Sequence, residues 1–92
     1  MTIDTILEML KVELGVSTDA YDETFTMIIE YAVDEIQREG IELDLSAVSD
    51  ETLVSMYAAW LWRKRETGEG MPRMVRYALN NRLFSQKMQE EG

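Results

Sequence analysis

The chain has 92 residues, a net charge of −9, and neither cysteine nor histidine. A chain of this length forms one domain, 1–92, with a modest core and no room for a deep substrate cleft, so we do not expect an enzyme. Without cysteine and histidine there is no disulfide framework and no thiolate or imidazole metal site, and we expect neither metal nor cofactor. No basic segment precedes an apolar run at the N-terminus, and the longest apolar run is too short to cross a bilayer, so we expect a soluble protein made in the cytoplasm.

The negative charge is distributed unevenly along the chain. Residues 1–51 hold fourteen acidic and two basic residues, whereas residues 52–92 hold four acidic and seven basic ones. Two interpretations follow. Either the halves pair within the chain and the excess charge keeps the protein soluble, or the basic surface of one copy meets the acidic surface of the next, which favours head-to-tail association.

Two amphipathic helices are predicted in the first half of the chain. Apolar residues at helical spacing predict one helix over 3–14 and a longer one over 19–39. Gly15 and Gly40 follow them, as expected where a helix ends in a left-handed conformation. Residues 17–19 (Ser-Thr-Asp) supply N-cap chemistry for the longer helix.

The outer face of the longer helix is acidic and carries a line of three residues, Glu23, Glu30 and Asp34. A charged face on a surface helix is usually solvated, and the alternative is a docking surface for a basic partner. Both interpretations remain open from the sequence.

Residues 41–45 alternate between apolar and acidic side chains, the two-residue period of a strand. Because the chain offers no second strand to pair with it, we expect an extended connector that inserts its apolar side chains between the helices. An intermolecular strand is the alternative. Ser46 or Ser49, followed by two acidic residues, is expected to cap the next helix.

The third predicted helix, over 50–66, is apolar nearly all round, and the domain is expected to be organised around it. One face faces the core with Leu53, Met56, Tyr57 and Trp60, and the opposite face carries no charge, with Ser55, Ala58, Ala59 and Trp62. Such a helix is normally covered on both sides. The second face is either covered within the chain, by the first helix or the 41–45 connector, or it is a subunit interface anchored by Trp62.

A fourth helix is predicted over 72–88, after a break at 68–70, and residues 89–92 should fray. Arg82 falls on its inner face, where the side chain must reach past the edge of the core or find a carboxylate. The opposite side carries a partly basic stripe of Arg73, Arg76, Asn80, Phe84 and Lys87. A pI near 4.3 is unlike that of a nucleic-acid-binding domain, so a protein partner is the favoured interpretation of this stripe.

The order of these segments resembles a known family. Residues 19–23 (DAYDE) open the long amphipathic helix, residues 57–65 (YAAWLWRKR) form the apolar one, and residues 68–73 (GEGMPR) lead to a last helix containing 77–82 (YALNNR). In order, length and character, nearly the whole chain resembles the small head–tail connector (adaptor) proteins of long-tailed bacteriophages and of the prophages derived from them.

The resemblance implies an all-α, four-helix virion assembly protein without enzymatic activity or cofactor. Such connectors form a homo-oligomeric ring beneath the portal protein at the head–tail junction, extend the channel through which DNA passes without specific binding, and support the next neck or tail completion protein. Together with the charge distribution, it predicts an interface with Trp62, Arg63, Arg65, Arg73 and Arg76 on the basic side and Glu23, Glu30 and Asp34 on the acidic side. The alternative is a small acidic phage-encoded regulatory protein that binds a DNA-binding partner through the acidic line.

Overall fold

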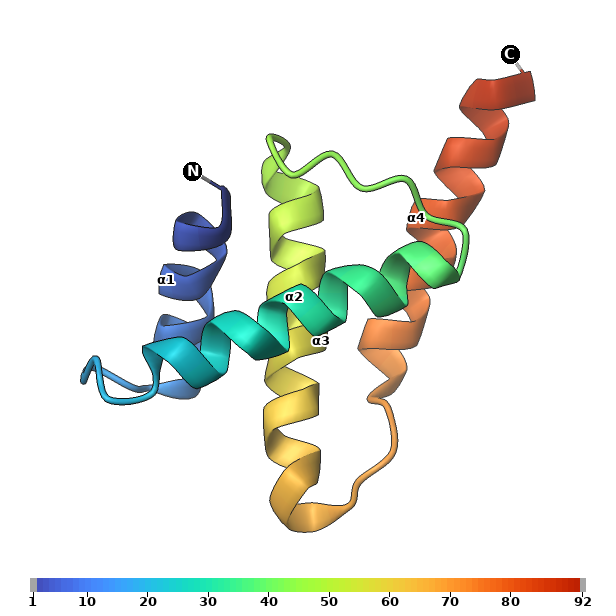
Figure 1. The fold of residues 1–92 in the computed structure, drawn as a ribbon. Helices are drawn as coiled ribbons and strands as arrows, with labels where there is room; N and C mark the ends of the chain where they lie inside the picture. Colours follow the sequence, from blue (N-terminus) through green and yellow to red (C-terminus); the bar gives the residue numbers. More distant parts are fainter. Residues whose placement is uncertain (1, 92) are drawn as a thin grey trace.

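The computed structural model describes residues 2–91, which form four α-helices and no strand (Figure 1). The helices are α1 (Thr2–Leu14), α2 (Asp22–Arg38), α3 (Val48–Thr67) and α4 (Arg73–Glu91). The all-α fold class predicted from the hydrophobic periodicity is therefore confirmed.

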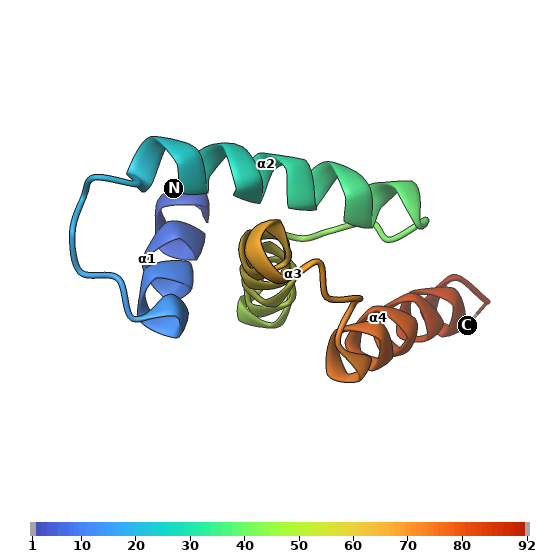
Figure 2. The same ribbon diagram turned by 90° about the horizontal axis from the view of Figure 1, so that it is seen from below.

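The helix α3 is the centre of the domain and contacts each of the other three helices. Figures 1 and 2 show α1 on one side of α3, α4 on the other, and α2 crossing as a separate layer over α1 and α3. The molecule is flat, with extents of 46 × 31 × 18 Å. An apolar helix in this position is covered on several sides, as its sequence requires.

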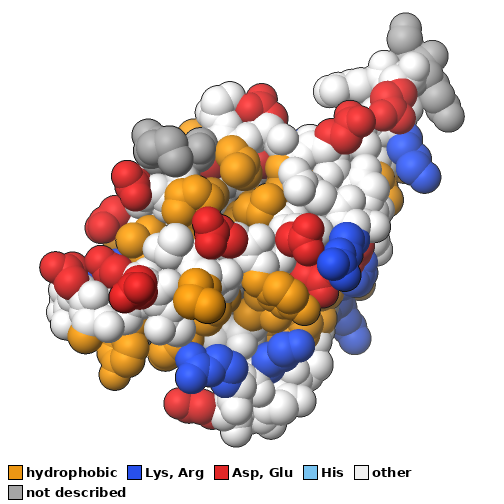
Figure 3. Space-filling view, in the orientation of Figure 1, with side chains coloured by type: hydrophobic (Ala, Val, Ile, Leu, Met, Phe, Trp, Pro, Cys, Tyr) orange, Lys and Arg blue, Asp and Glu red, His pale blue; other side chains and the backbone are white. Residues whose placement is uncertain are grey.

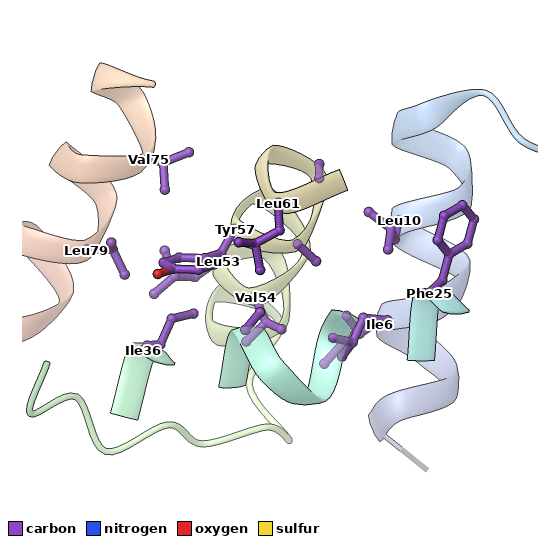
Figure 4. Close-up of a cluster of buried hydrophobic side chains, with 14 of the residues drawn as sticks. Ile6, Leu10, Phe25, Ile36, Leu53, Val54, Tyr57, Leu61, Val75 and Leu79 are labelled. Carbon is purple, nitrogen blue, oxygen red and sulfur yellow. The ribbon is translucent and has the colours of Figure 1, made fainter. Parts of the chain in front are cut away.

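The core is formed mainly by the inner faces of α1, α2 and α3. Figure 4 shows Leu10 and Phe25 on one side of α3, and Val75 and Leu79 on the other. Within the described residues Val75 and Leu79 are the buried apolar residues that α4 contributes. The contact between α4 and α3 is smaller than that of α1 or α2 with α3.

The segment between α2 and α3 is an extended connector, as predicted. Ile41 is buried and Leu43 and Leu45 are partly buried against the core, whereas Glu42 and Asp44 are exposed. The two-residue alternation therefore marks a connector that follows the protein surface with one side inward.

The predicted helix caps were wrong. The N-cap of α2 is Tyr21 and that of α3 is Ala47, and neither makes a side-chain capping hydrogen bond. The Asp19 carboxylate instead contacts Lys11, and the Ser46 hydroxyl donates to Asp44. The polar side chains that the local sequence pattern assigned to helix capping therefore make other contacts, Asp19 with α1 and Ser46 within the connector turn.

The helix α4 continues to Glu91, through three of the four residues that were predicted to fray, and Gly92 lies outside the described residues. The last two turns project beyond the rest of the molecule (Figure 1). A helix that ends away from the core presents its surface to a partner or to solvent.

Candidate protein-interaction surfaces

The uncharged second face of α3 is not available to another subunit. Ser55 is 2% exposed, and Ala58 and Ala59 are fully buried within the chain. Trp62 is half-buried, with its ring 4.7 Å from that of Phe25 and 5.8 Å from that of Tyr21, both in edge-on contacts. The aromatic rings that cover Trp62 therefore come from the start of α2, an element not predicted from the sequence for this role.

The basic cluster at the end of α3 makes contacts within the chain. The Arg65 guanidinium lies 4.4 Å from the ring centroid of Trp62, and the Lys64 ammonium lies 4.6 Å from that of Trp60. Arg63 approaches Glu13 of α1 at 3.9 Å. Each of these three cations therefore has a contact within the chain, on an aromatic face or near α1.

Arg76 of α4 binds Glu39, just beyond the end of α2, through two hydrogen bonds of 2.8 and 3.1 Å. The hydrogen bond to Glu39 raises the pKa of Arg76 above its ordinary value, against a smaller opposing effect of burial. Arg73, one turn earlier, is exposed and forms no ion pair within residues 2–91. Of the two predicted interface arginines on α4, Arg73 is the one that remains free for a partner.

The acidic line of Glu23, Glu30 and Asp34 lies on the exposed outer face of α2. Asp34 pairs with Arg38 at 3.3 Å, a surface contact one turn away. Glu23 and Glu30 form no ion pair with any part of the chain that the structure describes. Beside them Tyr31 donates a hydrogen bond to Glu35 at 2.9 Å, and this bond raises the pKa of the Tyr31 phenol.

A buried ion pair that the sequence only half predicted joins α4 to the start of α3. Arg82 donates to both carboxylate oxygens of Asp50, at 2.8 and 3.1 Å, and to the Glu42 carbonyl at 2.7 Å. Asp50 is 2% exposed and also accepts from the Asp44 N–H at 2.8 Å. Burial opposes ionisation of Asp50, but the hydrogen bonds from Arg82 and Asp44 outweigh it and lower the pKa of this carboxyl.

Gln86, one turn after Arg82, extends this contact along the connector. Its amide donates to the Gly40 carbonyl at 2.8 Å, and its oxygen accepts from the Glu42 N–H at 2.7 Å. We call Asp50, Arg82 and Gln86 the polar clamp. The clamp satisfies connector backbone groups and fixes α4, which has little apolar contact of its own.

A second ion-pair cluster, which the sequence reading missed, joins α1 to the start of α2. Lys11 is 7% exposed, and its ammonium lies 3.0 Å from Asp19 and 2.9 Å from Asp22. The hydrogen bonds to Asp22 and Asp19 raise the pKa of Lys11 despite its burial. The signal in the sequence was Lys11, which is followed, after the turn at Gly15, by the acidic residues Asp19, Asp22 and Glu23.

Large apolar side chains are exposed on two outer faces. On α4 they form what we call the α4 stripe, 57–74% exposed, of Met74, Tyr77, Phe84 and Met88. On α2 the exposed residues Met27 and Tyr31 border a shallow hollow of about 330 Å³, which Leu61 and Arg65 of α3 complete. The face in Figure 3, which α2 crosses, shows acidic and apolar side chains side by side, while most of its basic side chains lie along the lower and right-hand edges.

A hollow of about 670 Å³ lies between α3 and α4, with the Asp50–Arg82 pair in its wall. Within the described residues there is no group of three or more acidic residues placed to hold a metal ion. No helix in residues 2–91 combines the length and apolar character needed to cross a membrane.

The chain was compared with protein-family models, with curated proteins and with solved structures. No family model, no curated protein and no solved structure matches it. The surfaces described above are therefore the basis of the functional proposal.

Proposed function

We propose that this protein is a structural subunit of a bacteriophage or prophage virion. It forms a ring at the head–tail junction, between the portal protein and the tail, and extends the DNA channel. The order and character of its helices support this proposal through the resemblance to head–tail connectors.

The observation that carries the proposal is the pair of exposed faces with opposite charge. Among residues 2–91, the outer face of α2 holds carboxylates without an ion-pair partner (Glu23, Glu30) beside apolar residues, and the outer face of α4 holds cations without one (Arg73, Lys87) beside the α4 stripe. An exposed apolar patch with a polar border is more often a protein-binding site than an arbitrary part of the surface is. Two different faces on one chain suit heterologous contacts, which close into rings when the rotation per subunit divides the circle.

The second candidate, a regulatory protein that binds through the acidic line, uses the α2 face alone. It gives no role to the α4 stripe, whose large apolar side chains are costly to leave in water. An assembly subunit uses both faces. We therefore prefer the assembly role.

The test is a deletion of the gene from the phage or prophage genome that carries it. After induction, negative-stain electron microscopy should show heads and tails that form but remain separate, with DNA lost from the heads. Expression of the wild-type protein from a plasmid should restore joined particles, which excludes an effect on neighbouring genes. Intact infectious particles from the deletion strain would overturn the proposal and favour the regulatory role.

A further inference from the structure

We propose that the outer face of α4 binds the outer face of α2 of a second copy of this chain, with the two helices antiparallel. The inference rests on the proposed function for its role in assembly, and on the geometry of the two faces for the contact itself. It names which surfaces meet, in which direction, and with which residues opposed.

The α4 stripe is large enough to serve as a binding surface. Its four residues lie at positions 74, 77, 84 and 88, on the side of the helix opposite the buried residues Val75 and Leu79. At their exposed fractions they present on the order of 500 Å² of mainly apolar surface, the size of the largest patch on a typical monomer, which is often a functional one. Asn81, also exposed, is the polar position in the middle of the stripe.

The α2 face offers a smaller apolar surface with a hollow beside it. Met27 and Tyr31 are 68% and 53% exposed and lie one turn apart. The hollow beside them, bordered by Ile28 and Leu61, gives a large side chain a place to insert. The two apolar surfaces and their charged flanks together approach about 1,000 Å², the lower limit for a specific interface, so we expect an association that is weak for two isolated copies.

Charge selects the occupant of the α4 stripe. The cations Arg73 and Lys87 flank it, and no acidic residue lies on that flank between them. An antiparallel pair of α4 helices from two copies would bring these cations together, which is unfavourable, and a parallel pair would leave them without opposing carboxylates. The α2 face carries the opposite charge in Glu23 and Glu30, which have no ion-pair partner within residues 2–91.

The side on which the charges lie selects the direction. On α4 the cation Arg73 immediately precedes the apolar residue Met74, and on α2 the anion Glu30 immediately precedes the apolar residue Tyr31. The charged flank therefore lies on the same rotational side of the apolar residues in both helices. When two right-handed helices face each other, equivalent flanks meet only if the helices run antiparallel.

The spacing of the charges agrees with this direction. Arg73 and Lys87 are about 21 Å apart along α4, and Glu23 and Asp34 are about 16 Å apart along α2, at 1.5 Å per residue. An antiparallel pair therefore places Arg73 near Asp34 and Lys87 near Glu23, within the reach of their side chains. In the same register Tyr77 lies over Tyr31, and Phe84 lies over Thr24, which borders the hollow together with Met27.

The first test is cross-linking between single-cysteine variants, which the absence of native cysteine makes free of background. A short bismaleimide should join Lys87→Cys to Glu23→Cys, and Arg73→Cys to Asp34→Cys, at least about fivefold faster than it joins Arg73→Cys to Glu23→Cys. Each variant alone measures the rate of cross-linking between two copies of that same variant. A higher rate between Arg73→Cys and Glu23→Cys, the parallel arrangement, or between two copies of one variant would overturn the inference.

The second test is self-association measured by sedimentation from micromolar to millimolar protein. Phe84→Ser should weaken it by about tenfold or more, whereas Val12→Ser, at an 80% exposed position on α1, should leave it unchanged. Lys87→Glu should weaken it by about fivefold, and mixing this variant with Glu23→Lys should restore association. Glu8→Lys on α1 changes the net charge by the same amount as Glu23→Lys and is its control, so mixing Glu8→Lys with Lys87→Glu should not restore association.

The two proposals fail in different ways. A protein that remains monomeric at every concentration would overturn the α4–α2 contact, even if the deletion strain accumulates separate heads and tails. Self-association with the predicted cross-links in a protein whose deletion leaves virions intact would keep the contact and overturn the virion role.

Discussion

Asp50 and Arg82 are 32 positions apart in the chain, yet they form an ion pair that links α4 to the start of α3 and in which Asp50 is buried. A buried pair of this kind gives little net stability compared with apolar residues of the same size, but the loss of one partner is costly. We expect Asp50→Asn to lower the free energy of unfolding by about 2–4 kcal/mol at pH 7, measured by urea denaturation. Asp34→Asn, at an exposed surface pair, should change it by less than about 0.5 kcal/mol.

The same pair predicts the response to acid. The pKa of Asp50 is lower in the folded protein than the unfolded value of about 4, so the unfolded chain binds more protons as the pH falls. The stabilisation is complete above about pH 4 and is lost as the pH falls through the folded pKa. Urea denaturation at pH 7 and pH 3 should therefore show a smaller loss of stability in Asp50→Asn than in the wild type. An equal loss in both proteins would contradict this assignment.

Trp62 gives a second prediction at this scale, because the structure places it within the chain and the sequence left it open. Its edge-on contacts with Phe25 and Tyr21 predict that Trp62→Ala lowers the free energy of unfolding by about 2–3 kcal/mol. Tyr77→Ala, an aromatic truncation on the exposed face of α4, should cost less than about 0.5 kcal/mol. Similar stabilities for the two variants would mean that Trp62 does not contribute to the core.

At the scale of the helices, Gly68 ends α3 in a left-handed conformation with φ of 67°. A Cβ at this position would meet no atom within 4 Å, so substitution carries a backbone cost alone. Gly68→Ala should lower the free energy of unfolding by about 1 kcal/mol. Gly70→Ala is the matched control, since Gly70 is equally open and lacks the positive φ, and it should be neutral or slightly stabilising.

The helix α4 is expected to open before the rest of the fold. It contributes two buried apolar residues and is otherwise held by the polar clamp and by the Arg76–Glu39 pair. Hydrogen exchange should therefore be faster for backbone amides of α4 than for those in the middle of α3, and Arg82→Ala should accelerate exchange in α4 more than in α1. Uniform acceleration across all four helices would show instead that α4 opens only with global unfolding.

The helices were predictable because each repeats a local apolar pattern, and the connector because it alternates from Ile41 to Leu45. The first residues of α2 and α3 were not predictable, because Asp19 and Ser46 make contacts that the local pattern does not reveal. The sequence indicated that Arg82 must either reach past the edge of the core or find a carboxylate, but periodicity cannot select Asp50 from eighteen acidic residues. The α4 stripe was missed because Phe84 alone of its residues was noticed, as part of a partly basic stripe, and the exposed fractions that identify the other three come only from the structure.

The whole molecule combines a large net charge with two faces of opposite sign, and these features respond to salt in opposite ways. At about 10 mM salt the Debye length is about 30 Å, comparable to the molecule's 46 × 31 × 18 Å extents, so the excess negative charge repels itself across the fold. Raising the salt to about 300 mM should therefore increase the melting temperature of the monomer. The same change should weaken the contact between α4 and α2 of neighbouring copies, because its exposed charge pairs are screened. Thermal melting at low protein concentration and sedimentation at high concentration, across one salt series, measure the two effects separately. If association strengthens with salt, the apolar residues of the two faces dominate the contact, and the charged flanks do not set its direction.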